Sequence, residues 1–112
     1  VDVLVATTRE RGSKEDPDAF TAERAKQLNF AALTVSVPPA HVKGEIEWPN
    51  GGPADPKQHF VTTKRDFLTS NEFLDKIRAR ARVGGPEAND VLIFVHGYNT
   101  LYEEAVYWMA QI

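Results

Sequence analysis

This sequence predicts an α/β fold, and two observations indicate it. Residues 91–95 are five consecutive apolar residues, and a run without polar alternation is typical of a strand buried on both faces in a parallel sheet. Amphipathic helical patterns flank this run and start at about Ser70 and Leu101. Strand, helix, buried strand, polar turn and helix follow one another in the order of an α/β protein. We therefore predict a mixed sheet with residues 91–95 at or near its centre.

The composition is that of a globular protein and excludes several functional classes. The 112 residues amount to about one domain, with 42% hydrophobic and 26% charged residues. A formal net charge of −3 excludes a domain that binds polyanions by bulk charge, because such domains are strongly basic. No cysteine is present, which excludes a disulfide framework, a thiolate zinc site and a cysteine nucleophile. The longest apolar run falls far short of the roughly 20 residues that a membrane span needs.

The first elements follow from alternation and charge. Residues 1–7 alternate apolar and polar side chains, as a half-buried strand does. Residues 9–18 are crowded with charge and predict an exposed loop. Residues 20–27 weakly favour a helical turn or two. Residues 33–37 alternate again and predict a β-branched strand.

A long loop and a short strand come next. Proline donates no ladder hydrogen bond, so Pro38 and Pro39 must end the preceding strand. Residues 40–58 are rich in glycine and proline and predict a loop, with Ile46 and Trp48 anchoring it to the body. Residues 60–63 are a short strand candidate.

The first helix has a start signal and a stop signal. Thr69 stands three residues before Glu72, the spacing of a capping box. Residues 84–86, Gly-Gly-Pro, end the pattern. The apolar side chains expected to face the core are those of Phe73, Leu74, Ile77 and Ala81.

The second helix has a similar start. Thr100 and Glu103 have the capping-box spacing. The residues expected to form the apolar face are Ala105, Trp108, Met109 and Ile112. No stop signal follows them, and Val1 already belongs to a strand pattern. We therefore expect residues 1–112 to be a single partial domain, truncated at both ends.

The turn between the predicted buried strand and the second helix is the candidate site. In open parallel sheets, ligands bind outside the carboxyl ends of strands, where helix N-termini offer unpaired N–H groups. Gly97 would free the turn backbone and let a substrate approach, and the main-chain N–H of Tyr98 would face a developing negative oxygen. For His96, satisfaction by its own loop is favoured over proton transfer. For Asn99 and Thr100, helix capping is favoured over substrate contact.

The motif His96-Gly97-Tyr98-Asn99-Thr100, followed by Tyr-Glu-Glu-Ala at 102–105, resembles a family of bacterial α/β-hydrolases of unknown function in the esterase/lipase superfamily. The opening strand, residues 33–41 and residues 44–47 resemble that family's lead-in to the hydrolase core. The resemblance thus spans nearly the whole chain. It implies the N-terminal part of an α/β-hydrolase-like sheet with flanking helices, with lead-in strands and loops at 1–68 and the start of the core at 69–112.

The resemblance also implies chemistry. In this fold the loop after the corresponding strand supplies one oxyanion-hole donor. That assigns Gly97 and Tyr98 to the oxyanion hole, with His96 and Asn99 in supporting roles. The nucleophile of such enzymes lies in Gly-x-Ser-x-Gly, and neither Ser13, Ser36 nor Ser70 has that context. The Ser, Asp and His of the triad are expected downstream of Ile112, so the chain alone is expected to be inactive.

The remaining expectations concern ligands, partners and location. The resemblance implies a small-molecule or lipid ester as substrate, no cofactor and no nucleic acid, and it leaves the bacterial cytoplasm and the cell envelope both open. His41, His59 and His96 lack metal-site spacing, so we predict no metal site. We expect the 112-residue chain to self-associate through an exposed strand edge and unmatched apolar helix residues. The alternative is a non-catalytic binding or assembly module with its contacts at Trp48, Tyr102, Tyr107 and Trp108.

Overall fold

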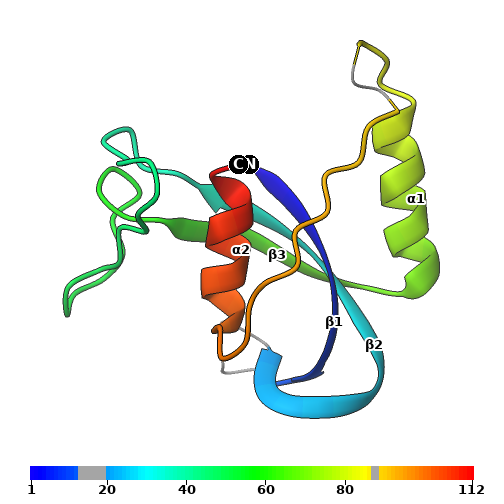
Figure 1. Ribbon diagram of the computed structural model, residues 1–112, viewed down its shortest axis with the longest axis horizontal. Helices are drawn as coiled ribbons and strands as arrows, with labels where there is room; N and C mark the ends of the chain where they lie inside the picture. The colour runs from blue at the N-terminus through cyan, green and yellow to red at the C-terminus, as the bar shows by residue number, and fades with distance from the viewer. Residues whose placement is uncertain (13–19, 87–88) are drawn as a thin grey trace.

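The computed structural model describes residues 1–12, 20–86 and 89–112 (Figure 1). The three strands are β1 (Asp2–Arg11), β2 (Phe20–Ser36) and β3 (Val61–Leu68), and the two helices are α1 (Ser70–Ala81) and α2 (Tyr102–Ala110). No helix in these ranges is long and apolar enough to cross a bilayer.

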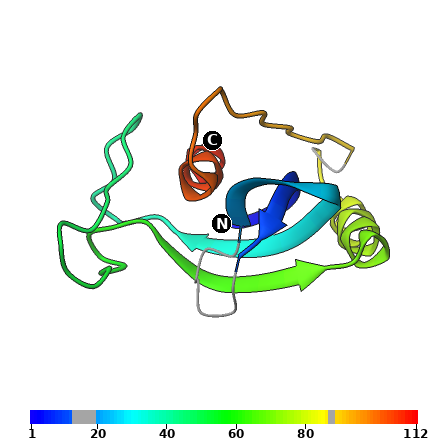
Figure 2. The ribbon, with the colours of Figure 1, turned by 90° about the horizontal axis from the view of Figure 1, so that it is seen from below.

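The strands form one antiparallel sheet in the order β1-β2-β3. Val3 lies opposite Leu33, and Val35 lies opposite Thr62. Figure 2 shows α2 and the chain that leads into it on one side of the sheet, with α1 at one end. One face of the sheet is therefore covered by α2.

The core lies between that face and α2. Ala31, Leu33 and Val35 alternate along β2 and are buried, since alternate residues of a strand share a face. Four residues of α2 are buried against them: Tyr102, Val106, Tyr107 and Ala110. Phe60, just before β3, completes the cluster at 2% exposure.

The strand predictions are confirmed except at the first hairpin. Residues 1–7, 33–37 and 60–63 fall largely within β1, β2 and β3, each of which is longer than predicted. Residues 20–27 are strand and not helix, because they pair with the continuation of β1: Arg9 lies opposite Arg24, and Arg11 opposite Phe20. Residues 9–11 accordingly belong to β1, and residues 13–18 of the predicted loop lie outside the described residues.

The loop after β2 is anchored as predicted. β2 ends at Ser36, before the two prolines. Ile46 packs against the core, and the Trp48 ring lies 5.3 Å from that of Tyr107. The main-chain N–H of Phe60 donates to the Glu47 carbonyl at 3.0 Å, which joins the end of the loop to its middle.

Helix α1 begins with the predicted capping box. The Thr69 hydroxyl accepts from the Glu72 N–H at 3.2 Å, and the Glu72 carboxylate accepts from the Thr69 N–H at 3.1 Å. These bonds hold the pKa of Glu72 below its ordinary value. No residue of α1 is buried, so local capping has a large share in its stability.

Replacing Thr69 with alanine is expected to destabilise α1 by about 1 kcal/mol, because the Glu72 N–H loses the hydroxyl that accepts its hydrogen bond. Amide hydrogen exchange across residues 70–81 measures this. Ser70→Ala removes a neighbouring hydroxyl that does not cap the helix, and its exchange rates should stay close to those of the parent. Equal acceleration in both variants would contradict the capping role.

Helix α2 begins one residue later than predicted, and its predicted capping box is wrong. Leu101 is the N-cap residue and gives no side-chain cap, while the Thr100 hydroxyl donates to the Gly97 carbonyl. The predicted apolar face is also wrong. The residues of α2 that are buried against the sheet are Tyr102, Val106, Tyr107 and Ala110. Ile112 is 71% exposed.

The prediction for residues 91–95 is wrong in this structure. They form neither a strand nor a helix, they do not belong to the sheet, and all five are exposed. Strands β1 to β3 already pair with one another, and a parallel central strand needs hydrogen-bonded neighbours and helices on both faces. No residue of α1 is buried. This helix therefore does not pack over residues 91–95 as the helix of a β-α-β crossover would.

Candidate functional site

The predicted site residues form a turn between residues 91–95 and α2, drawn in orange in Figure 1. Asn99 holds the left-handed conformation of the turn, with φ 56°, a region in which asparagine is enriched. Gly97 does not have a positive φ. The expectation that Gly97 supplies the conformational freedom of the turn is therefore wrong. A Cβ added there would meet only the Thr100 Oγ1, at 4.0 Å.

The peptide group between Gly97 and Tyr98 is held by two hydrogen bonds. The Gly97 carbonyl accepts from Nδ1 of His96 at 2.8 Å and from Oγ1 of Thr100 at 3.0 Å. A carbonyl only accepts, so Nδ1 of His96 carries the proton. His96 is therefore satisfied by its own loop, as the sequence favours.

These two bonds also fix the direction of the Tyr98 N–H. A trans peptide is planar and places its N–H opposite its carbonyl. The Tyr98 N–H therefore points away from His96 and Thr100, and none of the described residues accepts a hydrogen bond from it. The Tyr98 side chain is fully exposed. This main-chain donor is oriented and available to an anionic oxygen.

Arg9 ties the turn to the sheet. Its Nη2 donates to the Thr100 carbonyl at 2.6 Å, across 91 residues of sequence. Sequence reasoning misses this contact because the charge-rich pattern of residues 9–18 predicts a loop. The charge-rich context of Arg9 gave no sign of a role at the turn.

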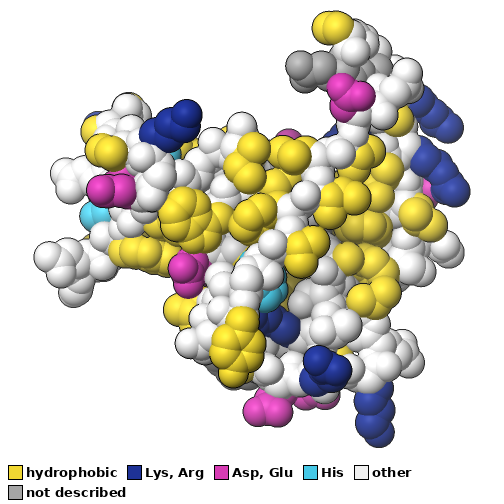
Figure 3. Space-filling model, in the orientation of Figure 1, with side chains coloured by type: hydrophobic (Ala, Val, Ile, Leu, Met, Phe, Trp, Pro, Cys, Tyr) yellow, Lys and Arg dark blue, Asp and Glu magenta, His cyan; other side chains and the backbone are white. Residues whose placement is uncertain are grey.

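A groove reaches the turn from the sheet. It has a volume of about 1260 Å³ and lies between β1, α1, residues 89–96 and α2. His96 lines one part of it, and Phe73 and Ile77 of α1 line another. Figure 3 shows hydrophobic side chains gathered on this face of the molecule. Gly97 and Tyr98 themselves do not line it.

His41 belongs to the quoted segment 33–41 and Glu47 to the quoted segment 44–47. Both residues lie away from the turn. The His41 Nδ1 is 2.9 Å from the Glu47 Oε2, and the other carboxylate oxygen accepts from the Val42 N–H at 2.8 Å. Gln111, after the C-terminal end of α2, donates to the Glu45 carbonyl at 2.9 Å. The turn precedes the opposite end of the helix, so the fold does not bring His41 and His96 together.

The Glu47 carboxylate makes part of the stability depend on pH. Its pKa is held below the ordinary value of 4.5, first by the Val42 N–H and then by His41. A depressed folded pKa means that the stabilisation is complete above the unfolded pKa and is lost as the pH falls through the folded pKa.

In the parent, the free energy of unfolding should decrease as the pH falls below about 4.5. Replacing Glu47 with glutamine is expected to make this decrease smaller. Urea unfolding midpoints measured from pH 3 to pH 7 test this. Glu45→Gln removes a charge from the same loop and leaves the His41–Glu47 pair intact, so it should keep the parent's slope. A parent-like slope for Glu47→Gln would contradict the assignment.

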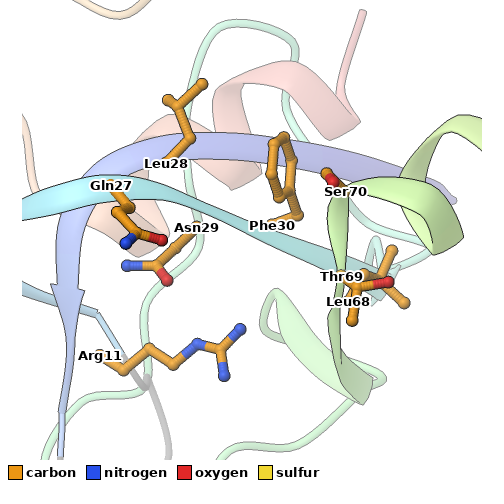
Figure 4. A pocket seen from close by; sticks show the side chains of 8 residues that line it. All are labelled: Arg11, Gln27, Leu28, Asn29, Phe30, Leu68, Thr69 and Ser70. Atoms are coloured by element: carbon orange, nitrogen blue, oxygen red, sulfur yellow. The ribbon is translucent and has the colours of Figure 1, made fainter.

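A second hollow of about 550 Å³ lies near the N-terminal end of α1 (Figure 4). Two of its polar side chains already have structural partners: Asn29 Nδ2 donates to the Arg9 carbonyl at 2.8 Å, and the Thr69 hydroxyl caps α1. The Arg11 guanidinium lies 4.4 Å above the Phe67 ring. None of the predicted site residues lines this hollow.

The histidines lie in separate local contacts. His59 Nδ1 accepts from the Asp55 N–H at 3.0 Å, while His41 and His96 have the partners given above. In the part of the chain that the structure describes, no group of three His, Cys, Asp or Glu side chains is placed to hold a metal ion.

Residues 72–112 match the model of a protein family described as alpha/beta hydrolase of unknown function (DUF900). The match confirms the hydrolase resemblance for this part of the chain, which includes α2 and the turn. Residues 1–71, which carry the other quoted segments, lie outside it. No curated protein and no solved structure matches the chain.

Proposed function

We propose that residues 69–112 are the start of a serine α/β-hydrolase core that cleaves ester or related acyl bonds. The Tyr98 N–H would be one oxyanion-hole donor. Gly97 would keep the approach open, and His96 and Asn99 would hold the turn. Residues 1–68 would be lead-in structure, and the nucleophilic serine, the acid and the histidine would follow Ile112 in a longer protein.

The observation that carries this proposal is the oriented Gly97–Tyr98 peptide. Oxyanion stabilisation depends on donors that are already aimed at the position where charge develops, so that they need no reorganisation during the reaction. Two bonds to the Gly97 carbonyl supply that orientation. The family match over residues 72–112 supports the same class of chemistry.

The proposed mechanism gives each residue one task. A serine oxygen attacks the acyl carbonyl carbon, and the carbonyl oxygen becomes an oxyanion in the tetrahedral intermediate. The Tyr98 N–H donates a hydrogen bond to that oxyanion. His96 and Thr100 hold the donor in place and exchange no proton with substrate. Arg9 secures the end of the turn to β1.

The groove supports a substrate with an apolar acyl group. It is lined by apolar side chains of β1, α1 and residues 91–95, and it reaches His96. An apolar chain bound along it would gain hydrophobic free energy in proportion to the area removed from water. The proposed substrate class is therefore an ester with an apolar acyl chain.

The alternative is a binding module with its contacts at Trp48, Tyr102, Tyr107 and Trp108. Two of these four residues are not accessible to a partner. Tyr102 and Tyr107 are buried in the core, where they pack on Phe20 and Phe60. The Trp48 ring packs partly against the Tyr107 ring. The proposed contact surface at these aromatic residues is therefore not favoured.

The reading frame downstream of Ile112 and an esterase assay test the hydrolase proposal. We expect a Gly-x-Ser-x-Gly motif several tens of residues after Ile112, and hydrolysis of a p-nitrophenyl acyl ester by the longer protein. Residues 1–112 alone should stay at background, because an oxyanion donor has nothing to stabilise until a nucleophile attacks. A stop codon directly after Ile112 would contradict the proposal, as would turnover by residues 1–112.

A further inference from the structure

The pair Asn50-Gly51 lies in the loop between β2 and β3. Figures 1 and 2 show this loop extending away from the sheet. Both residues are exposed, and neither belongs to a helix or a strand. Gly51 has a φ of 79°, and a Cβ added to it would meet nothing within 4 Å. The backbone of this pair is therefore open to solvent.

No hydrogen bond holds the pair in place. Among the described residues, none accepts from the Gly51 N–H, and none bonds to the side-chain amide of Asn50. The nearest anchors along the chain are Trp48, whose ring packs on α2, and Asp55, whose N–H donates to His59 Nδ1 at 3.0 Å. Between these anchors the backbone of Asn50 and Gly51 is free to change its dihedral angles without breaking a contact of the core.

We propose that Asn50 is a site of spontaneous deamidation through a cyclic imide. The Gly51 main-chain nitrogen loses its proton to a base and attacks Cγ of Asn50. The bond between Cγ and Nδ2 breaks, and the leaving nitrogen takes up a proton and departs as ammonia. Water then adds to either carbonyl of the imide and opens it, which leaves aspartate or isoaspartate at residue 50. The net change exchanges ammonia for water and needs no oxidant, reductant or enzyme.

The other asparagines lack one or more of these features. Each of the four is followed by a residue with a side chain, which hinders attack by that residue's nitrogen: Asn29, Asn71, Asn89 and Asn99. Asn29 is also held in the sheet, where its Nδ2 donates to the Arg9 carbonyl at 2.8 Å. Asn71 lies in α1, and the N–H of the next residue, Glu72, donates to the Thr69 hydroxyl at 3.2 Å. We therefore expect deamidation at Asn50 before any of these four.

The modified loop should leave the core intact. The carboxylate formed at residue 50 adds one negative charge to the formal net charge of −3, and isoaspartate lengthens the main chain by one carbon atom. Phe60 and its main-chain bond to the Glu47 carbonyl lie outside the modified stretch. The melting temperature should therefore stay that of the parent. The reaction needs only water and an open loop, so it is independent of the proposed hydrolase activity.

Peptide mapping after incubation at 37 °C tests the proposal. Trypsin cleaves after Lys43 and Lys57, and the peptide 44–57 contains Asn50 as its one asparagine. We expect this peptide to gain about one dalton, and to gain it faster at pH 8 than at pH 6 because the attacking nitrogen must lose its proton. An isoaspartyl carboxyl methyltransferase with labelled S-adenosylmethionine should then methylate the incubated chain and not the fresh chain.

Two glycine variants provide the matched comparison. Gly51→Ala should slow the mass gain by about tenfold or more, because a Cβ hinders attack by the nitrogen of its own residue and disfavours a φ of 79°. Gly52→Ala keeps the Asn50-Gly51 pair, and Gly52 has no positive φ and no atom near its Cβ position. Gly52→Ala should therefore deamidate at the rate of the parent.

Three results would overturn the proposal. The first is an equal rate in Gly51→Ala and Gly52→Ala. The second is a mass gain that occurs earlier in a peptide carrying another asparagine than in 44–57. The third is a parent rate lower by about a factor of ten or more than that of a synthetic peptide of residues 44–57, since this would mean that the fold holds the loop closed against the reaction.

Discussion

Replacing Phe60 with alanine is expected to lower the free energy of unfolding by about 3–5 kcal/mol, the usual cost of emptying a buried aromatic site. Phe60 is almost fully buried, and its ring lies 5.1 Å from that of His41 and 5.3 Å from that of Tyr107. It therefore joins the 40–58 loop to α2. A small domain has only about 5–15 kcal/mol in total, so the variant should be close to unfolding.

Urea unfolding followed by circular dichroism measures this effect. Phe94→Ala is the matched control, because it removes the same side chain from the exposed segment. Its cost should be at most about 1 kcal/mol. Equal costs for Phe60→Ala and Phe94→Ala would contradict the core described above.

Replacing Gly97 with valine is expected to lower kcat/KM of the longer hydrolase by about a hundredfold or more and to leave its fold intact. The backbone at Gly97 is open to other residues, and an added Cβ would make only an ordinary contact with Thr100. The valine methyl groups would instead occupy the space beside the Tyr98 N–H, where a substrate must approach. Loss of one oxyanion interaction costs roughly 10²–10³ in rate.

The assay for Gly97→Val is p-nitrophenyl ester hydrolysis, with thermal unfolding measured on the same preparation. An unchanged melting temperature with a lowered kcat/KM is the expected result. A variant that melts much earlier would indicate that Gly97 has a structural role, which the geometry at residue 97 does not support.

Local signals predicted the parts of the fold that depend on local interactions. The capping box of Thr69 and Glu72 closes within one helical turn, so its spacing in the sequence was enough. Pro38 and Pro39 ended β2 for a reason that holds in any sheet. The turn at His96 was found because a polar turn between an apolar run and a helical pattern is itself a local signal.

The parts that failed depend on partners that are distant in the sequence. Residues 20–27 have little strand propensity of their own, and pairing with β1 makes them strand. The apolar run at 91–95 indicates burial, but burial needs neighbouring strands and covering helices that residues 1–12, 20–86 and 89–112 do not place around it. The capping signal of Thr100 gave way to a bond with the Gly97 carbonyl. The spacing alone does not decide whether this hydroxyl accepts from a helix N–H or donates to a turn carbonyl.

The most direct test of the proposed oxyanion role compares two substitutions at residue 98 in the longer protein. Tyr98→Ala keeps the main-chain N–H and removes only an exposed side chain, so much of kcat/KM should remain. Tyr98→Pro deletes the N–H itself and should lower kcat/KM by about 10²–10³. With both variants shown to be folded by circular dichroism, a Tyr98→Pro enzyme with the kcat/KM of Tyr98→Ala would contradict the assignment of this turn to the active site.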